Sequence, residues 1–101
     1  TIHVDDSLFQ GNRSTDWGGG LLAFGMDDVR IVDTVFQQNS AASIGGAAHF
    51  SEGPALISGT RFISNTATHF GGGVYADITD LTVGNSDFIS NTADFGGGIF
   101  A

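Results

Sequence analysis

The stretch FISNTATHFGGGVYA, at residues 62–76, returns almost unchanged as FISNTADFGGGIFA at residues 88–101. Two copies this similar in a short chain indicate a repeat architecture, in which stacked units bury a core that no single unit could bury. The quoted stretch reduces to two linked elements, an F-x-x-N motif and a following glycine pair. Both elements can be traced through the whole chain.

The F-x-x-N motif occurs four times, and its phenylalanines are 27, 26 and 26 residues apart. Its residues are Phe9, Phe36, Phe62, Phe88, Asn12, Asn39, Asn65 and Asn91. The glycine pairs are Gly18, Gly19, Gly45, Gly46, Gly71, Gly72, Gly96 and Gly97, and the last pair follows its asparagine one residue sooner. The spacing divides a single domain into repeats at about 2–28, 29–54, 55–80 and 81–101, which we expect to belong to a longer solenoid.

Each repeat contains three short segments with strand character. Apolar and polar residues alternate before the phenylalanine, as in Val29-Arg30-Ile31, and this period of two is typical of a half-buried strand. A second strand begins at the phenylalanine, and a third follows the glycines, as at residues 74–76. The pattern predicts an all-β fold: a parallel β-helix of about four coils of 26–27 residues, with three short strands per coil.

This fold accounts for the repeated residue types. Equivalent positions in successive coils stack about 4.8 Å apart, the spacing of strands in a sheet. The phenylalanines then form an internal stack, and the asparagines form a side-chain amide ladder in which each amide donates to the next. The glycine pairs permit the positive φ angles of a tight corner.

The two motifs resemble the repeats of the polymorphic outer membrane proteins of chlamydiae, as in Phe62-Ile-Ser-Asn65 followed by Gly71-Gly-Gly-Val74. They are also similar to those of surface-associated β-helix proteins with pectate-lyase-like folds. The resemblance covers nearly the whole chain. It implies a right-handed helix, which the usual crossover rule also favours. It further implies a secreted or surface-exposed region that acts in adhesion or self-association.

The amino-acid composition restricts which partners and which location the protein can have. The 101 residues carry eleven acidic side chains, three arginines and no lysine, for a net charge of −8. Such a surface repels phosphate backbones and anionic lipids, so we expect neither nucleic-acid binding nor membrane insertion. No apolar run reaches transmembrane length. The chain has no cysteine. Its acidity suits an extracellular or cell-surface location.

One column of side chains has catalytic residue types. Stacking places Ser43, His69 and Asp94 on the three coils that follow that of Asp16, in the order of a Ser-His-Asp triad. The spacing of about 4.8 Å is too long for direct hydrogen bonds unless the side chains lean together. No repeat has room for a long loop that could form a substrate pocket. We therefore interpret the column as a solvated ladder at a turn, with no catalytic residue.

Acidic residues gather at the last corner of the coil. They are Asp27, Asp28, Glu52, Asp77 and Asp80. Calcium could relieve the repulsion between stacked carboxylates, but the chain lacks the motifs of calcium-binding β-rolls and EF-hands. We favour surface acidity over a metal site, with no cofactor, and keep calcium as the alternative.

Two hydroxyl columns give a further alternative, a flat ice-binding face. The first column comprises Ser7, Thr34, Thr60 and Ser86, and the second comprises Arg13, Ser40, Thr66 and Thr92. The arginine interrupts the flatness of the second column, so this interpretation is not favoured.

The sequence thus predicts a structural or adhesive extracellular module, a rigid solenoid that presents a surface or associates end to end into filaments or a matrix. Its partners would be neighbouring coils, copies of itself, or a polysaccharide or other cell-surface ligand. The alternative is a fragment of a pectate-lyase-like carbohydrate-active or polysaccharide-binding protein.

Overall fold

The computed structural model describes residues 1–25, 27–77 and 80–101, and all its regular elements are β-strands. The first sheet contains β1 (Ile2–Asp5), β5 (Val29–Val32), β9 (Ala55–Ser58) and β13 (Leu81–Gly84). The second contains β2 (Leu8–Gln10), β6 (Val35–Gln37), β10 (Arg61–Ile63) and β14 (Asp87–Ile89). The third contains β3 (Arg13–Ser14), β7 (Ser40–Ala41) and β11 (Thr66–Ala67). The fourth contains β4 (Leu21–Phe24), β8 (Ala48–Ser51), β12 (Val74–Asp77) and β15 (Ile99–Phe100).

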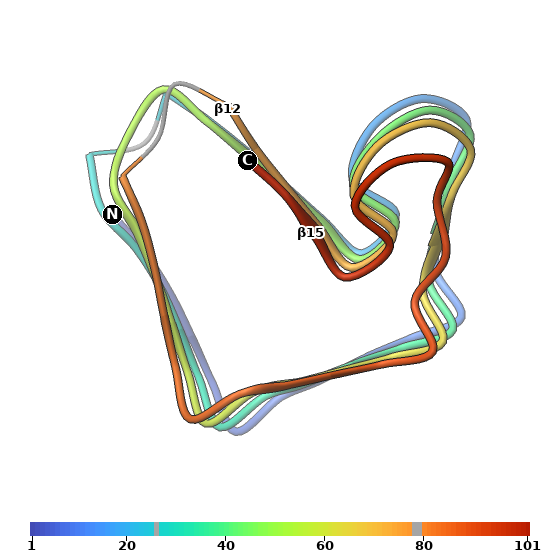
Figure 1. Cartoon of the computed structure of the whole chain (residues 1–101). Coiled ribbons are helices and arrows are strands. Elements are labelled where there is room, and N and C mark those ends of the chain that lie inside the picture. Colours follow the sequence, from blue (N-terminus) through green and yellow to red (C-terminus); the bar gives the residue numbers. More distant parts are fainter. Residues whose placement is uncertain (26, 78–79) are drawn as a thin grey trace.

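All strand pairs are parallel, and each strand pairs with the equivalent strand of the next coil. Phe9 lies opposite Phe36, which lies opposite Phe62, which lies opposite Phe88. Viewed along the stacking axis, the coils superimpose in one outline, with a rounded lobe beside β12 and β15 (Figure 1). The predicted parallel β-helix of about four coils is therefore confirmed.

The structure adds a fourth strand to each of the first three coils. This strand directly follows the motif asparagine and is only two residues long. In the last coil the same position is reduced to a single bridge between Thr66 and Thr92. A two-residue strand has no alternation of polar and apolar residues to reveal it, so the prediction of three strands per coil did not include it.

Sharp corners with left-handed backbone separate the strands. One corner column contains Asp6, Asp33, Gly59 and Asn85, with φ between 46° and 58°. A second contains Gly11, Gln38, Ser64 and Ser90, and a third contains the first glycine of each pair. Glycine, asparagine and aspartate adopt this conformation more readily than other residues. The turn residues therefore fix the corners, and the strands run straight between them.

The phenylalanine stack forms the centre of the core. Ring centroids in successive coils are 4.6, 5.0 and 4.6 Å apart, and the rings are within 10° of parallel. Phe36 and Phe62 are completely buried. Ile31, Ile57 and Val74 pack around them from the first and fourth sheets. Burial of each such side chain stabilises the fold by about 1.5–3 kcal/mol.

The glycine corner lies against the backbone of the next coil. A Cβ atom on Gly46 would overlap the backbone oxygens of Gly72 and Thr66. Thr66 belongs to β11, so the corner presses against the third sheet of the next coil. Gly45 has φ of 67°, and a Cβ there would crowd Ala48 and His49. The first glycine is needed for its backbone angle, and the second is needed because two backbones meet without space for a side chain.

Glycine-to-alanine substitutions test whether the second glycine is needed for the close approach of the two backbones. Gly46→Ala should lower the free energy of unfolding by more than about 3 kcal/mol, because the clash is with backbone on two sides. Gly84→Ala is the matched control, since a Cβ there meets nothing within 4 Å, and it should change stability by about 0.5 kcal/mol or less. Urea denaturation measures both. Similar stabilities for the two variants would contradict the close-approach explanation.

Candidate functional site: the side-chain ladders and the aromatic seam

The asparagine column is a continuous amide ladder. Asn12 Nδ2 donates to Asn39 Oδ1 at 3.0 Å, and Asn39 Nδ2 donates to Asn65 Oδ1 at 3.0 Å. Asn65 Nδ2 continues to Asn91 Oδ1 at 2.9 Å. Each Oδ1 also accepts the backbone N–H of the asparagine in the preceding coil, at 2.9–3.0 Å. The ladder thus joins side chains and backbone of successive coils.

A second donation ties the ladder to the phenylalanine strand. Asn39 Nδ2 donates to the carbonyl oxygen of Phe9, and Asn65 Nδ2 donates to that of Phe36, both at 2.9 Å. Asn39 and Asn65 are almost completely buried, and both amide groups use all their hydrogen-bonding capacity. These residues are fully engaged within the fold and offer nothing to a ligand.

The hydroxyl column faces inward. Thr34 and Thr60 are 1% and 0% exposed. Each hydroxyl donates to the carbonyl two residues earlier and, at 3.2–3.4 Å, is an acceptor for the backbone N–H one coil below. Their burial rules out the ice-binding interpretation, which required these hydroxyls on an exposed flat face.

The Ser-His-Asp column is stacked through its backbone. Ser43 N donates to Asp16 O at 3.0 Å, and His69 N donates to Ser43 O at 2.9 Å. The fourth coil is a residue shorter, and there the N–H of Phe95, which pairs with Phe70, donates to His69 O at 2.9 Å. Asp94 instead donates its N–H to Thr68 O at 3.4 Å. Within the described residues, no hydrogen bond or ion pair connects the side chains of Ser43, His69 and Asp94.

The acidic residues of the last corner do not converge. The Asp28 carboxylate pairs with Arg30 Nε at 3.1 Å. Asp27, Glu52, Asp77 and Asp80 are exposed. Across residues 1–25, 27–77 and 80–101, the group of acidic side chains close enough to share an ion is a different one, Asp5, Asp6 and Asp33.

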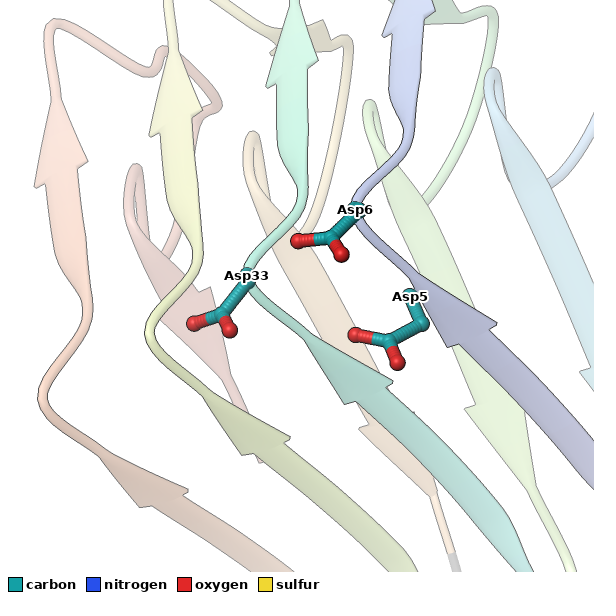
Figure 2. A group of neighbouring side chains, drawn as sticks. All are labelled: Asp5, Asp6 and Asp33. Carbon is teal, nitrogen blue, oxygen red and sulfur yellow. The ribbon is translucent and has the colours of Figure 1, made fainter.

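Asp5, Asp6 and Asp33 lie where β1 and β5 end, on adjacent coils, with their oxygens within 4.8 Å of one another (Figure 2). All three are exposed. Asp6 and Asp33 occupy the left-handed corner column, with φ of 46° and 49°. Aspartate tolerates that conformation, so the turn itself explains why these residues are acidic.

Aromatic side chains form a seam outside the core, which we call the aromatic seam. Its two columns are Trp17, Ile44, Phe70 and Phe95 before the glycine pairs, and Leu22, His49, Tyr75 and Phe100 on the outer face of the fourth sheet. The columns meet across the glycine corner: Phe70 lies 4.8 Å from Phe100, and Trp17 lies 5.6 Å from His49, between ring centroids. The signal in the sequence for this seam was the presence of apolar residues at outward as well as inward positions of the fourth-sheet strands, as in Leu21-Leu22 and Ile99-Phe100.

His49 is the unusual member of the aromatic seam. Its side chain packs edge-on against Trp17 and Tyr75, and the residue is only 4% exposed. Neither Nδ1 nor Nε2 has a hydrogen-bond partner in the part of the chain that the structure describes. Burial lowers the pKa of His49, and the nearby Asp77 carboxylate partly opposes this shift. The packing therefore favours the neutral imidazole.

The lowered pKa gives a pH-dependent stability. Because the unfolded chain binds the proton more tightly, stability should be fully present above about pH 6.5 and should fall as the pH drops toward the folded pKa. The slope is at most about 1.4 kcal/mol per pH unit. His49→Phe should abolish this slope between about pH 7.5 and 5.5, and the exposed-site control His3→Gln should retain it. Urea denaturation across the pH range tests this; the same slope in His49→Phe would contradict it.

The described residues contain no helix that is long and apolar enough to cross a membrane. No curated protein and no solved structure matches the chain.

Residues 6–23, 33–51 and 59–77 match the family model of the Chlamydia polymorphic membrane protein repeat. Each stretch runs from a left-handed corner through the F-x-x-N motif and the glycine pair into the fourth sheet. Together they cover more than half of the chain. The family points to structural repeats of outer-membrane or cell-surface proteins. The chain belongs to the Chlamydia polymorphic membrane protein repeat family.

Proposed function

We propose that the chain is a rigid, extracellular structural module that works by stacking end to end on coils of the same pattern, in an adhesive or self-assembling surface protein. The partner coil belongs either to a longer chain or to a second copy. The coils support this role because three left-handed corners recur in all four of them and the same four strands recur in the first three. The side chains of Ser43, His69 and Asp94 make no hydrogen bond or ion pair with one another among the described residues. We therefore propose no enzymatic role.

The observation that carries the proposal is that the two ends of the amide ladder leave different hydrogen-bonding groups unused. Within the described residues, Asn12 Oδ1 accepts no hydrogen bond, whereas the oxygens of the later asparagines accept two each. At the other end, and again among the residues that the structure describes, the backbone N–H of Asn91 has no acceptor and Asn91 Nδ2 donates to Phe62 O alone. The first coil thus offers an acceptor, and the last coil offers donors.

The two ends therefore complement each other. A coil placed above Asn91 in the same register would supply an Oδ1 for both free donors. Two last coils facing each other would instead bring donors against donors. The proposed association is consequently polar, head to tail, and such heterologous contacts generate open filaments when no rotation closes the ring. The ring faces of Phe9 and Phe88 would continue the aromatic stack across the junction.

Electron microscopy and analytical ultracentrifugation test the proposal. The wild-type chain should form rods, with or without EDTA, because the ladder contacts involve no metal ion. Asn91→Asp keeps the oxygen that accepts from Asn65 and keeps the backbone N–H, but it replaces the side-chain amide donor with an acceptor that repels the incoming Oδ1, so it should remain monomeric. Asn85→Asp makes the same change in the same coil, outside the ladder, and should still form rods. Discrete wild-type monomers, or rods in Asn91→Asp, would contradict end-to-end stacking through the ladder.

A further inference from the structure

A groove runs across the outer side of the first three coils, away from the coil ends. Its volume is about 360 Å³, and it is lined by Arg13, Ser14, Thr15, Ser40, Ala41, Ala42, Thr66 and Thr68. Two outward columns, Arg13-Ser40-Thr66 and Thr15-Ala42-Thr68, form its sides. This volume is at the small end of the range for ligand sites. None of these features takes part in the end-to-end stacking.

The groove differs in charge from the chain as a whole. The chain carries a net charge of −8, yet no lining residue is acidic. Arg30 pairs with Asp28 at 3.1 Å, and Arg61 lies 3.9 Å from Asp87. In the described part of the chain, Arg13 has no carboxylate partner. The groove therefore holds the one arginine whose guanidinium is free to bind an anionic group.

Side chains rather than backbone must recognise a ligand here. The N–H groups of Ser40 and Thr66 donate to Asn12 O and Asn39 O, both at 2.9 Å, and Ala42 N donates to Ser14 O at 3.1 Å. With these groups engaged between coils, a peptide cannot add as a further strand. The available partners are hydroxyls, which both donate and accept hydrogen bonds as sugar hydroxyls do, and the guanidinium of Arg13.

We propose that this groove binds the end of a glycan that carries a single carboxylate. Arg13 would hold the carboxylate, since a planar guanidinium matches its two oxygens. The hydroxyls of Ser40 and Thr66 would bind the sugar hydroxyls, and the exposed methyl group of Ala42 would contact the sugar ring. A polyanion does not fit, because its remaining charges would face the acidic surface with no arginine to bind them.

Isothermal titration calorimetry with small saccharides tests the site. The probes are cellobiose, its singly carboxylated counterpart cellobiouronic acid, and polygalacturonate. The wild-type chain should bind the carboxylated disaccharide about tenfold more tightly than cellobiose, a difference of about 1.4 kcal/mol. Arg13→Gln should abolish this preference, and Thr66→Val should weaken binding of both disaccharides. Arg61→Gln is the matched control and should leave binding unchanged.

Several outcomes would overturn the proposal: no heat of binding for either disaccharide, equal affinity for the two, an equal loss in Arg61→Gln, or tighter binding per site of polygalacturonate than of the disaccharide. Thermal unfolding of each variant establishes that it is folded. Because the groove lies on the side of the solenoid, failure of this test leaves end-to-end stacking unaffected.

Discussion

The amide ladder is the interaction on which the rest of the structure depends. An asparagine side chain in this position satisfies a backbone N–H, a carbonyl oxygen and two neighbouring amides, all in the interior. A buried polar group without partners costs about 1–3 kcal/mol, so one coil out of register would lose several such bonds at once. The ladder therefore requires each coil to bring an asparagine to the same point, which fixes the repeat length at 26 or 27 residues.

The other parts of the motif meet at this ladder. Each phenylalanine supplies the carbonyl that the next asparagine binds, and its ring is the central rung of the core. The glycine corner presses on the strand that begins after the asparagine, where Gly46 lies against Thr66 O. The phenylalanine, the asparagine and the glycine therefore contact the neighbouring coil at the same place in the repeat. The first sheet contributes apolar residues such as Ile31 and Ile57 to the core around the phenylalanine rings, but it takes no part in the amide ladder.

The sequence predicted the features that depend on this period. The phenylalanine and asparagine columns could be placed residue by residue, because identical side chains recur at a fixed spacing. The aromatic seam could not be predicted, because His49 lies on the outer face of its strand and packs there against Trp17 and Tyr75 of neighbouring coils. The one-residue shift of the backbone hydrogen bonds in the fourth coil could not be predicted either: Asp94 N donates to Thr68 O and Phe95 N donates to His69 O, although Phe95 still pairs with Phe70. The proximity of Asp5 and Asp6 to Asp33, by contrast, follows from the repeat, because Asp6 and Asp33 occupy equivalent corner positions of adjacent coils.

The free energy of unfolding of Asn65→Leu, compared with that of Asn12→Leu, tests most directly whether the ladder holds the coils together. Asn65→Leu removes the acceptor of the Asn39 N–H and of Asn39 Nδ2, and it removes the donor to the Phe36 carbonyl. Asn91 Oδ1 loses one of its two donors and keeps the backbone N–H of residue 65. The ladder account predicts a loss of about 3 kcal/mol or more for this variant. For Asn12→Leu, at the exposed end of the ladder, it predicts about 1 kcal/mol or less. Equal, small losses at the two positions would contradict it.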